Sequence, residues 1–390
     1  MKFGILPTSI LAIFALHTTV LAADVGWPGE VRDALKHAGG NRSELEAALR
    51  TVKGKDTEYL IAHASQYDLV NLTCQQIVEN VTYARKVHQA LPYLGKKLDD
   101  GLWREWVLPH RVLDEDLDLW RKDFHERLQP VVQDKKTVRE AVEAIHTWLM
   151  VKDASGAARI VYGTVNSENR CHTPAQMFKS GGGGCGELSM MFVYLLRAVG
   201  IPARHGLMTW HSNTNDQHYY CEYWDPQLRR WVPLDCSDEK PIAEIKTPAE
   251  KLKLGIFNSL SFFAHPGFPG VRDIYHTRCL DACLPVTDHL CPIQEVKLEV
   301  EAGISGTGTA YVWNLYSCRP VARGGTPGKP GASVLRLADT KKVNRPMLFT
   351  VTDGKALYWA LQCFTSQTGS VKLKRAVPGE CLRWADYGKP

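Results

Sequence analysis

Four consecutive glycines, Gly181–Gly184, run directly into a predicted helix that begins at Cys185. From Cys185 to Val199 the apolar side chains recur with the spacing of one helical face. They are Leu188, Met191, Phe192, Leu195 and Leu196. Gly200 and Pro202 are typical of a helix end. Because glycine lacks a Cβ atom and lets backbone approach another molecule, this feature predicts a cysteine held beside open backbone at the start of a buried helix.

Three strands are predicted after that helix, at residues 201–209, 217–224 and 230–234. The last two are joined by Asp225-Pro226-Gln227, which is a turn signal. Folding a hairpin about this turn places His218 opposite Asp235, or within one residue of it. The spacing therefore predicts that an imidazole and a carboxylate meet.

Cys185, His218 and Asp235 are the residue types of a nucleophilic thiol site. A thiol attacks as its thiolate, and a helix N-terminus with a nearby imidazole lowers a thiol pKa from about 8.5 to roughly 3.5–7.5. The histidine activates the thiol and later protonates the leaving amine, while the carboxylate orients the imidazole. The duller interpretations are a half-cystine, a half-buried strand histidine and a surface carboxylate. The glycine run and the shared spacing favour catalysis.

Other residues near the nucleophile are candidates for substrate binding. Backbone N–H groups at the helix start are expected to form part of an oxyanion hole, and Gln176 is a further candidate donor. Trp210 and Tyr219 are candidate walls of a substrate cleft, against the alternative of ordinary core or rim positions. Glu187 either disfavours the thiolate, if it faces the sulfur, or caps the helix.

No metal site, cofactor or nucleic-acid partner is predicted. His205, His211, His218 and Cys221 lie close in sequence, but no HExxH or CxxC spacing occurs. The acidic stretch that begins at Asp114 lacks the glycine of a calcium-binding loop. The formal charge of +5 is small for 390 residues, and the lysines and arginines form no dense block.

The N-terminus indicates export. Residues 1–22 combine an early lysine, an apolar run and a small-residue exit, which predicts a signal peptide and a mature chain that starts near Ala23. No later stretch reaches the roughly 18 apolar residues of a membrane span, so a soluble secreted or extracytoplasmic protein is expected, periplasmic in a bacterium. In a eukaryotic source, Asn41, Asn71 and Asn80 would carry glycans.

Eleven cysteines in an exported chain predict disulfide bonds, and the odd number leaves at least one thiol unpaired. Cys185 is the expected unpaired one. The others would form up to five bridges, in pairs that one sequence does not define. They are Cys74, Cys171, Cys221, Cys236, Cys279, Cys283, Cys291, Cys318, Cys363 and Cys381.

The length predicts several units after the signal peptide. They are a helical N-terminal region (23–151), a catalytic core (152–258), a cysteine-containing linker (259–292) and a C-terminal β-sandwich (293–390). Alternating apolar residues and turns rich in glycine and proline predict the sandwich. The oligomeric state is left open.

Three separated segments resemble the transglutaminase-like superfamily: GGGGCGELSMMFVYLLRAVGIPARHG, HYYCEYW and WVPLD. The resemblance implies a papain-like α+β core in which Cys185 is the nucleophile, His218 the base and Asp235 the orienting acid. Tyr220 departs from the tryptophan that the family usually has in its second segment. The Cys-Gly-Glu triplet is also similar to the peptide N-glycanases of the same superfamily.

The leading hypothesis is an exported thiol acyl-transfer enzyme that cleaves an amide bond of a peptide or protein through a thioester. Resolution of the thioester by an amine gives a transglutaminase, and resolution by water gives a protease, an amidase or a glycanase. One alternative is a non-catalytic binding or structural protein that keeps the fold. Another is a condensing enzyme that joins a small-molecule acyl donor to an amine.

Overall fold

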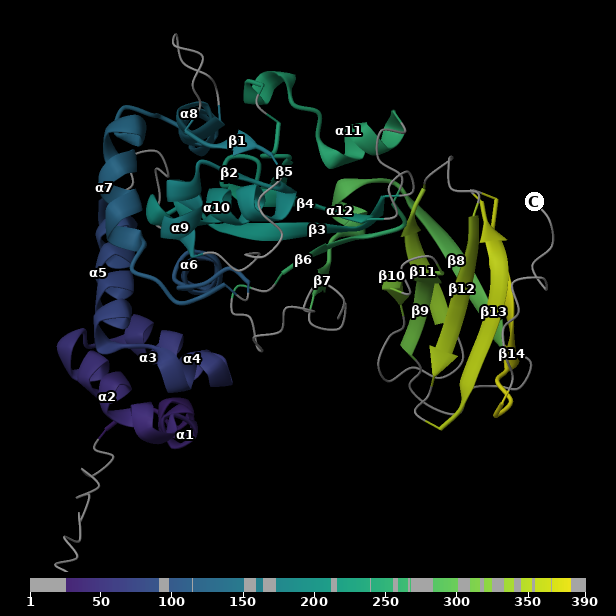
Figure 1. The fold of residues 1–390 in the computed structure, drawn as a ribbon, viewed down its shortest axis with the longest axis horizontal. Coiled ribbons are helices and arrows are strands. Elements are labelled where there is room, and N and C mark those ends of the chain that lie inside the picture. The colour runs from purple at the N-terminus through teal and green to yellow at the C-terminus, as the bar shows by residue number, and fades with distance from the viewer. Residues whose placement is uncertain are drawn as a thin grey trace, which may run out of the picture.

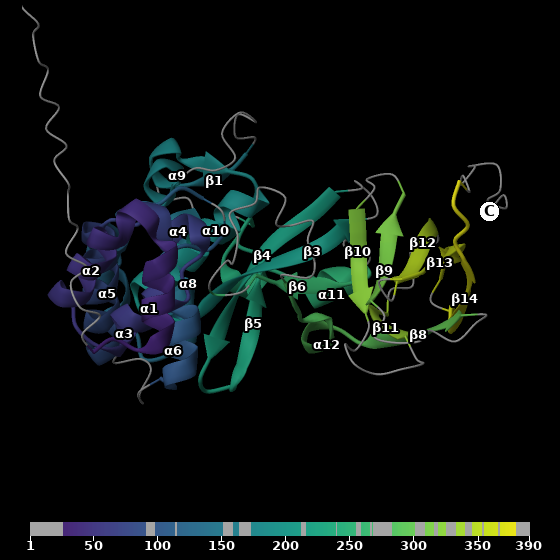
Figure 2. The same cartoon turned by 90° about the horizontal axis from the view of Figure 1, so that it is seen from below.

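The computed structural model describes residues 26–90, 98–113, 115–150, 159–163, 173–211, 216–238, 240–254, 259–265, 267, 283–300, 309–315, 319–324, 333–339, 345–352, 355–365 and 367–379. A helical region, a central sheet and a strand-rich C-terminal region follow one another along the molecule (Figures 1 and 2). This is the predicted α+β class. The predicted signal peptide, residues 1–22, lies outside the described residues. None of the helices described is both long enough and apolar enough to cross a membrane.

Eight helices precede the catalytic segment among the described residues. They are α1 (Gly29–His37), α2 (Arg42–Thr51), α3 (Lys55–Ala62), α4 (Gln66–Asn71), α5 (Cys74–Ala90), α6 (Asp100–Trp106), α7 (Arg121–Val132) and α8 (Val138–Met150), with a 3₁₀ turn at Gly39–Asn41. Their apolar faces share one buried core with α10 (Cys185–Ala198). The predicted boundary at residue 151 therefore does not separate two cores.

The central sheet packs on α10 through β3 and β4. Its strands are β3 (Ala203–His211), β4 (Asp216–Asp225), β5 (Arg230–Leu234), β6 (Phe262–Ala264) and β7 (Leu284–Pro285), in the order β5-β4-β3-β6-β7. All neighbours are antiparallel. The interpretation of residues 259–292 as a linker is wrong for this part, because β6 and β7 extend the catalytic sheet.

Shorter elements surround this sheet. They are β1 (Val161–Tyr162), β2 (Gly182–Gly183), α9 (Pro174–Ser180), a 3₁₀ turn at Ile242–Glu244, α11 (Pro248–Lys253) and α12 (Thr287–Leu290). Strands β1 and β2 form a separate parallel pair, in which Tyr162 lies beside Gly183. The glycine run therefore serves partly as a strand before α10 begins.

Two buried arginines fasten the helices to the catalytic segment. Arg121 donates to Asn80 Oδ1 at 2.7 Å, to Val107 O at 2.7 Å and to Arg197 O at 2.9 Å. Arg197, near the end of α10, donates to Arg111 O at 2.8 Å. Because buried guanidinium groups need acceptors, these carbonyl and amide contacts fix α5, α7 and the end of α10 in one arrangement.

The C-terminal region is a β-sandwich, as predicted. Its strands are β8 (Ile293–Val300), β9 (Thr309–Asn314), β10 (Arg319–Gly324), β11 (Ser333–Ala338), β12 (Arg345–Thr352), β13 (Leu357–Phe364) and β14 (Ser370–Arg375). The order β10-β9-β12-β13-β14-β8-β11 is interrupted by a weak junction, since β13 and β14 pair at two positions only. The two resulting layers enclose one apolar core.

The sandwich is joined to the catalytic sheet by buried contacts. Thr209 of β3 donates to Val321 O of β10 at 2.6 Å, and Ala338 N donates to Leu260 O at 2.7 Å. Trp210, next to Thr209, is buried with the sandwich core. The end of β3 therefore belongs to the joint between the two regions (Figure 1).

The three glycosylation sequons differ in what the fold allows. Asn80 is 3% exposed, and its Nδ2 donates to Leu108 O at 2.8 Å. Asn41 Nδ2 donates to both Leu69 O and Leu72 O at 2.9 Å. A glycan would replace a hydrogen of the same nitrogen, so the prediction of glycans at Asn80 and Asn41 conflicts with this fold. Asn71 is exposed, and its Nδ2 donates to Tyr67 O at 2.8 Å, so the other hydrogen of that nitrogen can still be replaced by a glycan.

Six of the described cysteines carry free thiols: Cys74, Cys185, Cys221, Cys236, Cys291 and Cys363. Cys283 lies near His265, with Sγ 3.9 Å from Nδ1. Cys171, Cys279, Cys318 and Cys381 lie outside the described residues. The prediction of disulfides is thus not realised among those six thiols and stays a prediction for the four outside.

Candidate active site

Cys185 occupies the first position of α10, directly after Gly184 in extended backbone. Glu187 folds back, and its Oε2 accepts the Gly184 N–H at 3.1 Å. Of the two roles considered for Glu187, the structure shows the cap. Ser189 donates to the Cys185 carbonyl oxygen at 2.6 Å. The first turn of the helix is therefore held from both ends, with the thiol half-buried.

His218 on β4 links the thiol to a carboxylate. Its Nε2 lies 3.0 Å from Asp235 Oδ2, and the imidazole also hydrogen-bonds to the Cys185 side chain. Because Nε2 faces Asp235, the nitrogen left for Cys185 is Nδ1. The structure thus brings Cys185, His218 and Asp235 together in one chain of contacts.

The register of the hairpin differs from the prediction by one residue. Cys221 pairs with Leu234, so the same register continued past β5 would set Asp235 opposite Tyr220. His218 is two residues from that position rather than at most one. Residues two apart on a strand share a face, so the Asp235 carboxylate still reaches the imidazole diagonally.

The contacts of His218 and Asp235 favour the charged forms of both. Burial alone would lower the pKa of His218, but the hydrogen bonds and charges of Asp235 and Cys185 raise it to about 10. Burial alone would raise the pKa of Asp235, yet His218 and Lys251 hold it well below its usual range. The hydrogen bonds of Asp235 and Cys185 to the ring therefore favour the imidazolium form of His218.

Lys251 and Ser237 complete the surroundings of Asp235, and neither was predicted. Lys251 of α11 donates to Asp235 Oδ2, the oxygen that also faces His218. Ser237 donates its hydroxyl to Asp235 Oδ1 at 2.6 Å. Both carboxylate oxygens are thus occupied. A lysine 16 residues after Asp235 on a separate short helix has no spacing signal that a sequence would reveal.

Tyr162 is a further residue that the sequence did not indicate. The backbone of Gly163 donates to Gly183 O at 3.1 Å, which sets β1 against the glycine run. Burial and the nearby Cys185 and Asp235 raise the pKa of the Tyr162 hydroxyl. Tyr162 is 55% exposed. It therefore forms a rim beside the thiol.

The predicted substrate-binding residues have different places. Trp210 is 1% exposed and packs in the sandwich core, so burial contradicts its role as a cleft wall. Gln176 is exposed, and its amide oxygen accepts the Thr173 N–H at 3.1 Å as the cap of α9. The Tyr219 ring is half-buried and lies 3.4 Å from where a Cβ of Gly186 would stand. Of the three, Tyr219 lies beside the nucleophile.

His205 supports the nucleophile from inside the protein. Its Nε2 is 2.7 Å from the Ser189 hydroxyl, which donates to the Cys185 carbonyl. Burial lowers the pKa of His205 to about 3, so the ring beside Ser189 is neutral. Within the described part of the chain, no three His, Cys, Asp or Glu side chains are grouped so as to hold a metal ion.

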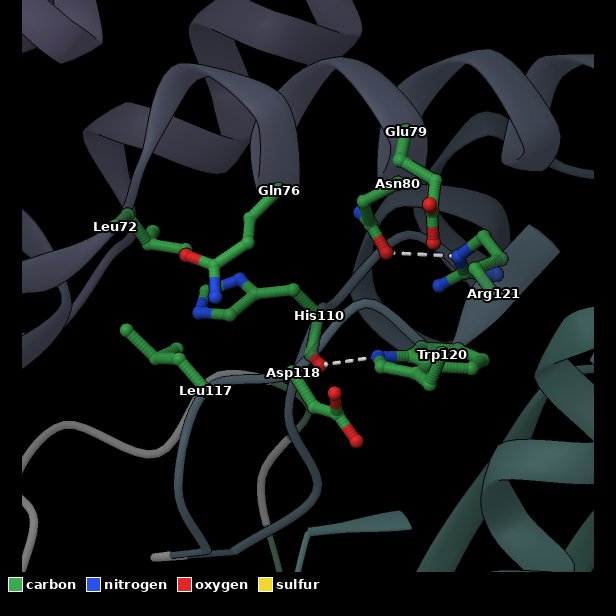
Figure 3. Close-up of a pocket in the computed structure, with 9 residues that line it drawn as sticks. All are labelled: Leu72, Gln76, Glu79, Asn80, His110, Leu117, Asp118, Trp120 and Arg121. Atoms are coloured by element: carbon green, nitrogen blue, oxygen red, sulfur yellow. Dashed lines mark hydrogen bonds between the residues drawn. The ribbon is translucent and has the colours of Figure 1, made fainter. Parts of the chain in front are cut away.

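A small pocket lies in the helical region, away from the three predicted catalytic residues (Figure 3). It is lined by Leu72, Gln76, Glu79, Asn80, His110, Leu117, Asp118, Trp120 and Arg121. Hydrogen bonds join some of these residues, from Trp120 Nε1 to His110 O at 2.9 Å and from Arg121 Nε to Asn80 Oδ1 at 2.7 Å. None of the three predicted catalytic residues lines it.

A sequence profile described as the Transglutaminase-like superfamily matches residues 126–236. The match begins within α7, so it includes helices that the sequence assigned to the preceding region. It ends just after Asp235. All three residues of the Cys185–His218–Asp235 chain lie inside it.

Curated relatives match a shorter segment. The peptide-N(4)-(N-acetyl-beta-glucosaminyl)asparagine amidase of Kluyveromyces lactis is 32% identical over 77 residues, 20% of this chain and 20% of the relative. The amidase of the same name from Eremothecium gossypii is 33% identical over 70 residues, 18% of each chain. The chain thus spans about a fifth of the length of these relatives.

The chain is also similar to solved structures at low sequence identity. Red sea bream transglutaminase is 10% identical with a TM-score of 0.27, over 69% of this chain and 61% of that one. The periplasmic domain of TgpA from Pseudomonas aeruginosa is 17% identical with a TM-score of 0.26, over 35% and 49%.

Proposed function

We propose that this protein, whose core belongs to the transglutaminase-like superfamily, is a cysteine hydrolase of carboxamide bonds. The observation that carries the proposal is the contact chain from Asp235 through His218 to Cys185 at the start of α10. Profile and relatives support an enzyme that acts on amide bonds. Resolution of the acyl-enzyme by water is the finer part of the proposal.

In the first half-reaction, the Cys185 thiolate attacks the carbonyl carbon of the amide. Backbone N–H groups at the start of α10, which have no helical acceptors, stabilise the oxyanion. The C–N bond then breaks, and the leaving nitrogen takes the proton of His218 Nδ1. The product is a thioester on Cys185 and a free amine. Asp235 keeps the imidazole oriented throughout.

In the second half-reaction, water attacks the thioester carbonyl and gives its proton to the now neutral His218. The C–S bond breaks, which restores the Cys185 thiolate beside an imidazolium and releases a carboxylic acid. Water is the proposed acceptor because the curated relatives that match this core are named amidases.

The test offers a glutamine peptide and an asparagine-linked glycopeptide in ¹⁸O-water together with a labelled primary amine. Hydrolysis predicts ¹⁸O in the acid product and loss of turnover in Cys185→Ala. Cys363→Ala, a half-buried thiol on β13 of the sandwich, is the matched control and should keep parental activity. Amine label without ¹⁸O would instead indicate a transglutaminase. Unchanged turnover in Cys185→Ala, or no acyl-enzyme with either substrate, would contradict the proposal and favour the binding-protein alternative.

We also propose that the protein is exported. The support is the apolar run of residues 1–22 with its small-residue exit before Ala23. N-terminal sequencing of the protein from its natural source should give a chain that starts near Ala23. A mature chain that retains Met1 in the cell interior would refute export.

A further inference from the structure

The catalytic carboxylate has two cationic partners on one oxygen. His218 Nε2 and Lys251 Nζ both contact Asp235 Oδ2, so the two nitrogens are separated by no more than two hydrogen-bond lengths. The exposed side-chain fraction is 2% for Asp235 and 14% for Lys251. Water therefore screens the three charges weakly. A residue that only orients a histidine does not require this second cation.

The position of Lys251 is fixed by the rest of α11. The next residue, Leu252, is buried in an apolar cluster with Tyr220 and Phe262 of the sheet. At the start of the helix, Thr247 and Glu250 cap each other, with the Thr247 N–H 2.8 Å from Glu250 Oε2. The Glu250 carboxylate thus accepts hydrogen bonds from Thr247, and the ammonium of the next residue, Lys251, contacts Asp235. In Figure 1, α11 lies beside the central sheet.

We propose that Lys251 is a positioning residue of the reaction: by sharing Asp235 Oδ2 with His218, it weakens the hold of the carboxylate on the imidazolium, so that His218 can release its proton to the leaving nitrogen. This inference rests on the proposed function. A general acid works best when its pKa is near the working pH. An imidazolium held by Asp235 and Cys185 without opposition would be a poor proton donor, and the ammonium acts against that.

The charges that face His218 come from several elements. Cys185 of α10 and Asp235 after β5 favour the imidazolium. The ammonium of Lys251 on α11, which contacts the same Asp235 oxygen, opposes it as a like charge. Glu187 and Tyr162 lie farther out, beside Cys185. Removal of the Lys251 ammonium alone should therefore raise the pKa of His218.

The test is the pH profile of Cys185 alkylation by iodoacetate, followed by peptide mass spectrometry. An anionic reagent reacts fastest with a thiolate that has an imidazolium beside it, so the basic limb of the profile reports loss of the His218 proton. In Lys251→Met the basic limb should move upward by about one pH unit. Lys251→Gln, which keeps a donor without the charge, should move it in the same direction.

Two variants serve as controls for this shift. Lys251→Arg keeps the charge and should keep the parental limb. Lys253→Met changes an exposed lysine on the same helix and should also leave the profile unchanged. If the parent shows a bell-shaped profile and the basic limb stays in place in both Lys251→Met and Lys251→Gln, the inference is overturned. A parent without such a profile would overturn the proposed Cys185–His218 pair itself, and the inference with it.

Discussion

Replacing Asp235 by asparagine removes the charge on which the His218 imidazolium depends, and leaves a side chain of the same shape. The pKa of His218 is raised to about 10, against about 6.5 for an ordinary histidine. At 1.36 kcal/mol per pH unit, this difference corresponds to about 5 kcal/mol in favour of the charged ring. Asp235 and Cys185 share this contribution, and Asp235 contacts the ring at 3.0 Å from a nearly buried position.

Loss of the carboxylate charge should lower the pKa of His218 by about 2 pH units, equivalent to about 3 kcal/mol. The Lys251 ammonium would then lie near the imidazolium without a carboxylate charge between them, which lowers the pKa of His218 further. An amide nitrogen that donates to Nε2 would also leave the proton on Nδ1, where the thiol needs an acceptor. The rate of Cys185 acylation should therefore fall by roughly 10²- to 10⁴-fold.

The assay is an NMR titration of ¹³C-labelled histidine in the parent and in Asp235→Asn, with the His218 signal assigned from His218→Gln. Circular dichroism shows whether the variant is folded. A parental midpoint near the ordinary 6.5 would refute the reasoning. So would a folded Asp235→Asn protein whose His218 still titrates where the parent does.

Other positions of the core give further predictions. The Tyr220 hydroxyl is fully buried and has no hydrogen-bond partner among the residues that the structure describes. Tyr220→Phe should therefore raise the free energy of unfolding by about 1 kcal/mol, measured by urea denaturation; a clear loss would contradict this. A Cβ at Gly206 would lie 2.5 Å from Tyr220 Cε2, so Gly206→Ala should cost about 1–3 kcal/mol in the same assay, and an unchanged midpoint would refute the crowding. Burial lowers the pKa of His146 to about 4 and of His205 to about 3. Below about pH 6.5 the unfolded chain therefore binds more protons than the folded one, and the free energy of unfolding should fall by about 1.4 kcal/mol per pH unit for each histidine until the folded pKa is reached. His146→Gln should remove the contribution of one histidine from that slope. An unchanged slope would contradict the burial of His146 as a neutral ring.

The catalytic helix and its strands could be predicted because local patterns define them. The apolar repeat after Cys185 and the glycine that follows Val199 gave α10 to within one residue at its end. The strands around His218 and before Asp235 alternate or carry a clear turn, and they were predicted nearly in full. These signals depend on period and on turn residues, which are properties of short stretches of chain.

The errors concern tertiary contacts. Trp210 looked like an aromatic wall, but a second region of the chain buries it. Strands β6 and β7 have three and two residues, too few for a period to be visible. The register of the hairpin was wrong by one residue, since turn chemistry alone did not define the pairing of Cys221 with Leu234.

The sequence reveals the nucleophile, base and acid of the candidate site, but not the residues that surround them. Cys185, His218 and Asp235 could be found from spacing and from family resemblance. Lys251 and Tyr162 reach the site from α11 and β1, which no local pattern connects to it. Gln176 illustrates the opposite case, because its amide caps its own helix.

The measurement that tests the central claim most directly is the rate of Cys185 alkylation by iodoacetamide at about pH 6 in the folded protein, located by peptide mass spectrometry. With His218 paired to Cys185, the parent should react rapidly, and His218→Ala should react at least roughly tenfold more slowly. Equal rates in the two proteins, or recovery of Cys185 in a disulfide, would contradict the Cys185–His218 pair and with it the proposed chemistry.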